Sequence, residues 1–197
     1  MQQNLSNTSP QTFYIQFGEL MPKTFKLFNS QGQCYYFRFL DGKTKRIRFN
    51  IPDSDEYTAN VPFDIIKRVP IELPVSYPPL PPAQRDRMKD VQVVFNPSLN
   101  GTPARIYSQI GKIEIGKKFL TYPPPIKLFL LLHEQGHLIY RDEIYCDLWA
   151  MINFLRLGYN QSTAFYSLSN VLSSSNENIS RLREMFRNIQ KTQKSKL

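Results

Sequence analysis

Residues 126–150 read IKLFLLLHEQGHLIYRDEIYCDLWA, and this stretch decides how the rest of the chain is interpreted. Its first half is apolar nearly all round, which predicts a buried helix that starts at the proline run 123–125. Its second half predicts another helix from Glu143 to about Leu157, with Asp142 as the N-cap and Gly158 at the end. The chain must therefore bend between these two helices.

Both histidines of the chain lie in the pentapeptide HEQGH. Residues i and i+4 share one face of a helix, so His133 and His137 are able to direct both imidazoles at one Zn²⁺ ion. Glu134 lies about 100° round the helix, where it can reach a metal-activated water without binding the metal. Zinc lowers the pKa of such a water toward 7, and Glu134 is expected to accept its proton as general base. Gly136 leaves room for the second helix beside this face.

A third metal ligand has to be a carboxylate, because no further histidine and no pair of cysteines is left. Glu143 is the favoured residue, with Asp147 and Asp142 as alternatives. Glu143 would face away from the metal on an unbroken helix, so its role requires a bend between Leu138 and Asp142. Asp147 lies one turn beyond Glu143, where we expect it to hold an imidazole N–H from behind the metal. The alternative is that the two histidines bind no metal and are ordinary core or surface residues. Burying two imidazoles without strong polar partners would then destabilise the fold.

Residues 12–51 are predicted to be rich in β-strands, because short runs of aromatic and β-branched residues alternate with polar ones. The dipeptide Asp41-Gly42 predicts a hairpin turn between the last two of these strands. Five prolines in 74–82 exclude a helix or a central strand and indicate an extended linker. The expected strands are 12–16, 24–28, 34–40 and 45–51.

Three more short strands, 91–95, 104–107 and 112–115, are expected before the first helix, and further helices near Asn160 and Asn176 after the second. Ser174 and Glu177 have the spacing of a capping box for the last helix. The fold class expected is α+β, a small β-rich domain followed by a short mixed sheet, the HExxH helix and three further helices. The expected divisions are a polar tail 1–11, the β-rich domain 12–73, a Pro-rich linker 74–90, the helical domain 91–190 and a basic tail 191–197.

The formal net charge is +9, and the basic residues concentrate in 23–48 and 181–196. Solvated faces explain this charge more simply than nucleic-acid binding by the basic segment 43–48. The two cysteines, Cys34 and Cys146, are expected to be reduced thiols. The longest apolar stretch, 126–132, is too short to cross a bilayer, and the polar start is unlike a signal peptide. We therefore expect a cytoplasmic protein without a membrane partner.

The segment HEQGH followed by EIYCDLWA resembles the gluzincin metallopeptidases, in which HExxH is followed by a helix that carries a Glu and, four residues later, an Asp. The ImmA/IrrE-like and CaaX-type proteases share this pattern, and the segment also looks like small HExGH proteins of bacteriophages. The resemblance implies that Glu143 is the third zinc ligand, that Asp147 orients a ligand histidine and that Glu134 is the general base. The short spacing from His137 to Glu143 is that of metzincins instead.

In such folds an edge strand aligns a peptide substrate by strand addition, and Lys112, Ile113, Glu114 and Ile115 look like this strand. The function expected is zinc-dependent peptide-bond hydrolysis with a peptide or protein as the substrate. The alternative is a structural or virion-assembly protein within a larger protein assembly, which retains the fold of a metallopeptidase. Candidates to stabilise the oxyanion are Tyr140, Arg141, Tyr145 and Tyr159.

Overall fold

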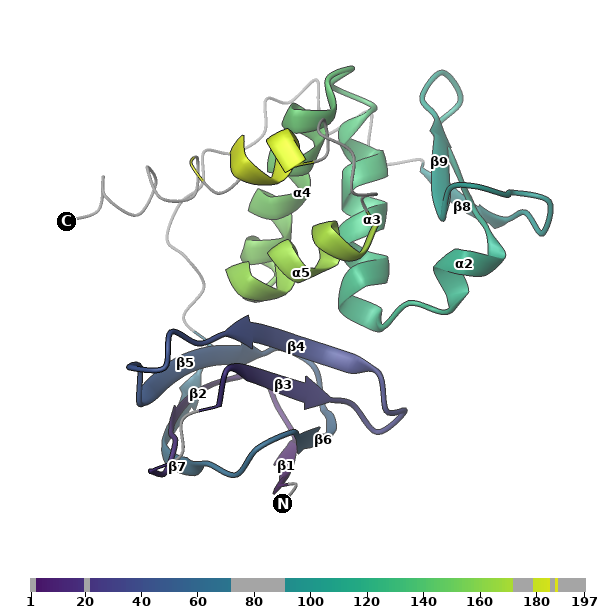
Figure 1. The fold of residues 1–197 in the computed structure, drawn as a ribbon. Helices are drawn as coiled ribbons and strands as arrows, with labels where there is room; N and C mark the ends of the chain where they lie inside the picture. The colour runs from purple at the N-terminus through teal and green to yellow at the C-terminus, as the bar shows by residue number, and fades with distance from the viewer. Residues whose placement is uncertain (1–2, 20–21, 72–90, 172–178, 185–186, 188–197) are drawn as a thin grey trace. The chain divides into compact units, whose positions relative to one another are not determined.

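The computed structural model describes residues 3–19, 22–71, 91–171, 179–184 and 187 of a mixed α/β protein, with strands toward the N-terminus and helices toward the C-terminus (Figure 1). The chain divides into two compact units. The first contains Met1–Val75, Pro123–Pro125 and Phe154–Ala164, and the second contains Ser76–Tyr122, Ile126–Asn153 and Phe165–Leu197. The predicted linker 74–90, the capping box at Ser174 and Glu177, and the basic tail 191–197 lie outside the described residues.

The first unit contains two sheets, with strand orders β1-β6-β3-β4 and β5-β2-β7, and the neighbouring strands are antiparallel. All four strands expected in 12–51 are confirmed with small shifts at their ends, and β1, β6 and β7 were not predicted. The strands are β1 (Gln3–Asn7), β2 (Gln11–Gln16), β3 (Thr24–Phe28), β4 (Cys34–Phe39), β5 (Arg46–Ile51), β6 (Asp55–Ala59) and β7 (Asp64–Pro70).

Aromatic rings from both sheets fill the core of this unit. Phe25 in β3 is fully buried, and its ring lies 5.4–5.6 Å from the rings of Phe17, Phe49 and Phe63. Phe13 of β2 stacks on Phe49 of β5 at 5.5 Å. Such pairs add to the free energy gained by burial, so this unit has a hydrophobic core of its own.

The hairpin predicted at Asp41-Gly42 is wrong, although the turn itself is present. Gly42 has a φ of 74°, and the Asp41 carboxylate accepts the backbone N–H of Lys43 and Thr44. However, β4 pairs with β3, whereas β5 pairs with β2 in the other sheet. The turn chemistry fixes a local reversal but does not determine which strands become partners.

Residues 1–11, expected to be a polar tail, instead contain strand β1. This strand pairs with β6 along its whole length, and the side chains of Leu5 and Asn7 are buried. The Asn7 amide donates hydrogen bonds to the carbonyls of Ile51 and Asp53. One buried leucine and an asparagine whose amide group donates two hydrogen bonds anchor a strand that its composition does not reveal.

The second unit contains a three-stranded sheet of order β8-β10-β9, built from β8 (Gln92–Phe95), β9 (Ala104–Tyr107) and β10 (Lys112–Ile115). These strands confirm the three that were predicted. β10 is parallel to β8 and antiparallel to β9. Its buried Ile113 packs with Ala104 of β9 and with helix residues Ile126 and Leu130, so one face of the sheet is part of a second core.

The helices are α2 (Lys117–Leu120), α3 (Pro124–Gly136), α4 (Glu143–Arg156) and α5 (Gln161–Val171), and residues 179–184 are also helical. The predicted helices therefore exist, and α3 begins within the proline run as expected. The last turn of α4 and the first turn of α5 belong to the first unit, and their remainders belong to the second. In the described part of the chain, no helix combines the length and the apolar character that crossing a membrane requires.

Replacing Leu5 with alanine should lower the free energy of unfolding by about 2–4 kcal/mol, because Leu5 is 1% exposed in the aromatic core. The neighbouring Ser6 points outward, so Ser6→Ala is the matched control and should change stability by less than about 0.5 kcal/mol. Urea unfolding of both variants makes the comparison. Equal stability of the two variants would mean that β1 is not part of the core.

Candidate metal centre

Helix α3 carries its first histidine on the face that it buries. Ile126, Phe129 and Leu130 are buried on this face, and His133 continues the same stripe with 9% of its surface exposed. A polar ring on a buried stripe needs polar partners, because a polar group that loses water without a new partner destabilises the fold. His133 must therefore have polar partners in the surrounding structure.

The chain leaves the helix at the position where the third ligand requires a bend. Helix α3 ends at Gly136, and the N–H groups of His137, Leu138 and Ile139 then bond to carbonyls three residues earlier. This tightened turn ends at Tyr140, so the two helices are not continuous. The predicted bend is thus present without a glycine or proline inside it.

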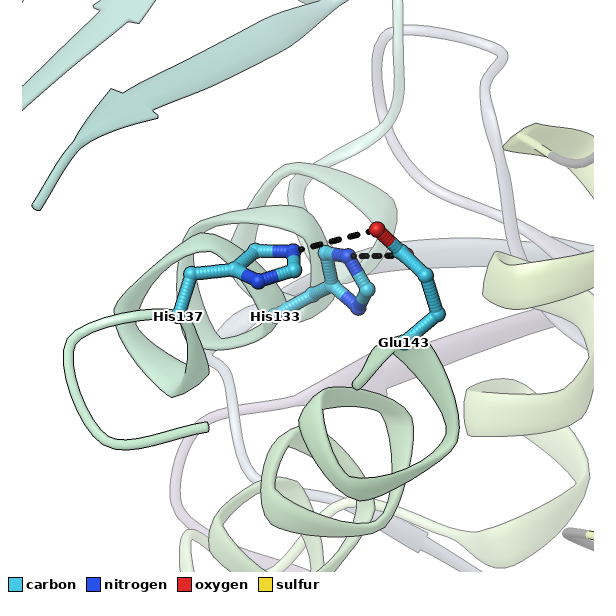
Figure 2. A group of neighbouring side chains, drawn as sticks. All are labelled: His133, His137 and Glu143. Atoms are coloured by element: carbon cyan, nitrogen blue, oxygen red, sulfur yellow. Dashed lines mark ion pairs between the residues drawn. The ribbon is translucent and has the colours of Figure 1, made fainter. Parts of the chain in front are cut away.

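Asp142 caps the next helix, as predicted. Its Oδ1 accepts the backbone N–H of Ile144 at 2.9 Å and that of Tyr145 at 3.2 Å. The cap fixes the start of α4 and so places Glu143 in its first turn. From there the Glu143 carboxylate points back toward the two imidazoles (Figure 2).

Three donor groups converge at this point. Glu143 Oε2 lies 3.3 Å from His133 Nε2, and Glu143 Oε1 lies 3.5 Å from His137 Nε2. One donor atom from each of the three residues lies within 4.8 Å of the other two. These three residues could hold a metal ion, whereas Glu134 is not a member of the group.

The spacing of these donors fits a small tetrahedral ion. Zinc bonds of about 2.0–2.1 Å at tetrahedral angles separate two ligand atoms by about 3.3–3.4 Å. The two nitrogen–oxygen contacts of 3.3 and 3.5 Å are of this size, but each involves a different oxygen of Glu143, and one donor atom from each residue lies within 4.8 Å of the others. Two imidazoles and one carboxylate are also a donor set that zinc accepts, and three protein ligands are typical of a zinc site that also binds water or substrate.

Behind His133, a buried carboxylate and a guanidinium complete the surroundings. Asp147 is 1% exposed, and its Oδ1 lies 2.9 Å from His133 Nδ1. Arg181, from the helical residues 179–184, donates Nε to Asp147 Oδ2 at 2.8 Å and Nη2 to Oδ1 at 2.9 Å. The same Nη2 lies 3.0 Å from Glu143 Oε2. One arginine thus connects the carboxylate behind His133 with the third donor of the group.

The charges of this cluster shift the pKa values of its members. Burial opposes protonation of His133, but the carboxylates of Asp147 and Glu143 outweigh it and raise the pKa to about 9. His133 and Arg181 lower the pKa of Glu143 to about 2, despite the opposing effect of burial. In the absence of a metal, the protonated imidazole supplies the positive charge that these acids require.

Glu134 lies on the side of α3 that faces strand β9. Burial raises the pKa of its carboxyl group, against the opposing effects of His133, His137 and the backbone N–H of Ile106, which favour the charged form. A carboxylate with a raised pKa accepts and releases a proton more readily near neutral pH than an exposed one. Glu134 is therefore close to the three donors and has the electrostatics of a proton acceptor.

These residues border a cleft of about 530 Å³, a size typical of ligand pockets. His133, Glu134, His137 and Glu143 line one part of it, and the edge of β9 lines another. The lining also includes Thr102, Ala104, Arg105, Ile106, Ser108, Tyr140, Arg141 and Arg181.

The substrate strand predicted at Lys112–Ile115 is in the wrong place. That segment is β10, the central strand of its sheet, and both of its edges are already paired. The strand with an edge on the cleft is β9, whose second edge has no strand partner among the residues that the structure describes. Short strands of similar composition do not reveal which of them is central.

The structure separates the four candidates for oxyanion stabilisation. Tyr140 and Arg141 line the cleft. Tyr145 is 58% exposed and stacks on Tyr140, while the Tyr159 hydroxyl donates to Asp53 in the first unit. Among the described residues, Tyr145 and Tyr159 are not part of the cleft lining.

Arg181 was not predicted as a site residue, because it lies in a basic segment that is expected to be solvated. Arg181 lies 34 residues from Asp147, so no local spacing connects the two. The only signal available was Asp147 itself, since a buried aspartate next to a histidine implies a cationic partner somewhere in the chain.

Comparisons with known proteins give no relative from which roles could be transferred. No protein-family model, no curated protein and no solved structure matches this chain.

Gly136→Ala should destabilise the protein, because the added Cβ would lie 3.0 Å from Cys146 Cα and 3.3 Å from Trp149 Cδ1. The crowding should cost about 1–3 kcal/mol, partly offset by the better helix propensity of alanine. Gly18→Ala is the matched control, because no heavy atom lies within 4 Å of a Cβ at that position. Thermal and urea unfolding measure both variants, and equal stability would contradict the close helix approach.

The metal-free protein should lose stability as the pH rises from about 6.5 to about 9. The folded pKa of His133, about 9, exceeds its unfolded value, so the gain from protonation is complete below 6.5 and disappears above 9. The loss should amount to about 3 kcal/mol at most. Urea unfolding in a chelator across this range, with His133→Gln as the reference, measures it. The same pH slope in both proteins would refute this assignment.

Proposed function

We propose that this chain is a zinc-dependent, metallopeptidase-like protein that hydrolyses peptide bonds. The observation that carries the proposal is the convergence of His133, His137 and Glu143 beside Glu134 in one cleft. The donor set favours zinc, because imidazole nitrogens make calcium and magnesium poor alternatives. A bound zinc ion would polarise a substrate carbonyl and lower the pKa of water.

Glu134 has the position and the chemistry of the general base in this proposal. Its carboxylate lines the same cleft as the donor group and interacts electrostatically with His133 and His137. Because burial raises its pKa, the proton that it accepts from water can be passed on to the leaving amine.

Strand β9 supports a peptide as the substrate. The N–H of Gly116 bonds to the carbonyl of Pro103, so in this antiparallel register the N–H of Ile106, three residues on, points away from β10. Alternate residues of an antiparallel strand face the same edge, so the backbone groups of Ala104 share this direction toward the cleft. A peptide that lay along this edge would pass close to Glu134 and the three donors.

The network behind the donors has a positioning role. Asp147 fixes the back of the His133 ring, and the Arg181 guanidinium balances the charge of Asp147 while it also contacts Glu143. Such outer contacts orient the ligands before a metal arrives, which strengthens binding.

Glu134→Gln should bind zinc as wild type does but hydrolyse peptides at least about 100-fold more slowly, because it removes the proton acceptor and no donor. Zinc titration and cleavage of a quenched fluorescent peptide library measure the two properties. Wild-type cleavage rates in this variant would contradict the role of Glu134. Zinc binding without hydrolysis by the wild type would reject the enzyme and leave only a metal-binding protein.

Glu143→Gln and Asp142→Asn form a matched pair, because each removes one negative charge from neighbouring acids. Glu143→Gln should weaken zinc binding by more than the roughly 10–100-fold that loss of an outer partner costs. Asp142→Asn should leave zinc affinity within about threefold, since asparagine caps the helix as well as aspartate does. Isothermal titration with zinc makes this comparison. Equal losses in both variants would show that charge alone, rather than a Glu143 ligand, determines the affinity.

A further inference from the structure

Each imidazole of the donor group has a neighbour at its second nitrogen, and both neighbours come from adjacent positions of α4. Asp147 faces Nδ1 of His133, whereas Cys146 faces Nδ1 of His137, with its Sγ at 3.2 Å. Cys146 is fully buried and sits at the point where α4 crosses Gly136. The sequence predicted only a reduced thiol at this position.

The Cys146 thiol has a second contact that determines the direction of the first. Its Sγ lies 3.6 Å from the carbonyl oxygen of Tyr140, and a carbonyl is only an acceptor. Because the thiol has one proton, both contacts are hydrogen bonds only when the S–H is donated to the Tyr140 carbonyl and the sulfur accepts the proton on His137 Nδ1. In a neutral imidazole, a proton on Nδ1 leaves the Nε2 lone pair free.

We infer that Cys146 is a positioning residue, whose thiol selects the tautomer of His137 that has Nε2 free to bind a metal. The chain of contacts runs from His137 Nδ1–H to Sγ and from the thiol S–H to the Tyr140 carbonyl. Burial raises the pKa of the Cys146 thiol to about 12, in keeping with a thiol that stays protonated. The inferred tautomer is argued from these contacts without the proposed function, and only its effect on zinc affinity rests on the proposed function.

A competing contact makes the inference open to a direct test. His137 Nε2 lies 3.5 Å from Glu143 Oε1, and this carboxylate would favour a proton on Nε2 when no metal is bound. The contact with sulfur is shorter and lies in the packed helix interface, whereas 45% of the Glu143 side chain is exposed. We therefore expect the proton of the neutral His137 ring to lie on Nδ1 in the native protein and to move to Nε2 when the sulfur is removed.

The Sγ position also separates this role from that of a metal ligand. The sulfur contacts Nδ1, whereas the nitrogen of His137 that belongs with the Glu143 donors is Nε2. Cys146 is not part of the donor group that the described residues form. The thiol therefore acts on the metal site through His137.

Nitrogen-15 NMR of the metal-free full chain at about pH 10 tests the tautomer, because long-range couplings distinguish a proton on Nδ1 from one on Nε2. At this pH the ring of His133, with a pKa of about 9, is largely neutral, while the Cys146 thiol keeps its proton. Wild type should show the Nδ1–H form of His137, Cys146→Ala should shift toward Nε2–H, and Cys146→Ser should restore much of the wild-type form. His133 is the internal control and should keep its Nδ1–H form in all three.

An Nε2–H form of His137 in the wild type, or an unchanged tautomer in Cys146→Ala, would overturn the inference. A zinc titration of the same proteins should show roughly 10–100-fold weaker binding by Cys146→Ala, with partial rescue by serine. If the wild type binds no zinc, the proposed function fails while the tautomer result stands. If Cys146→Ala binds zinc as tightly as wild type, the positioning role in metal binding fails.

Discussion

The site depends on how closely α4 approaches α3 where the second helix crosses Gly136. A Cβ at this position would lie 3.0 Å from Cys146 Cα, so any other residue would have to push α4 away by a few tenths of an ångström. This approach brings three side chains of α4 next to the imidazoles. They are the carboxylate of Glu143, the thiol of Cys146 and the carboxylate of Asp147. Helix packing, rather than the HEQGH motif alone, therefore assembles the donor group.

The second constraint is charge balance in a partly buried space. Asp147 is almost completely buried, and an isolated carboxylate there would destabilise the fold. Arg181 and His133 supply the compensating contacts, and the shifted pKa values of His133 and Glu143 are the result. A divalent cation would take over the role that the proton on His133 has in its absence, so metal binding and protonation should compete.

Sequence reasoning succeeded where the determining interactions are local. The apolar run before His133, the Asp142 cap and the glycine at 136 are each evident within a few residues, and the structure shows the helices and the bend that they predicted. It failed where partners are distant in sequence. Strand β1 is anchored by a single leucine, β5 pairs in a different sheet from β4, and β10 is central rather than at the edge. No residue close to Arg181 in the sequence indicates its contact with Asp147.

The central claim is that two imidazoles and the Glu143 carboxylate bind one zinc ion, with the thiol of Cys146 outside the coordination shell. X-ray absorption spectroscopy of the zinc-loaded protein tests this claim most directly. The account predicts a first shell of nitrogen and oxygen only, at about 2.0–2.1 Å, with outer scattering from two imidazole rings. A sulfur at about 2.3 Å, or a shell without imidazole scattering, would contradict it.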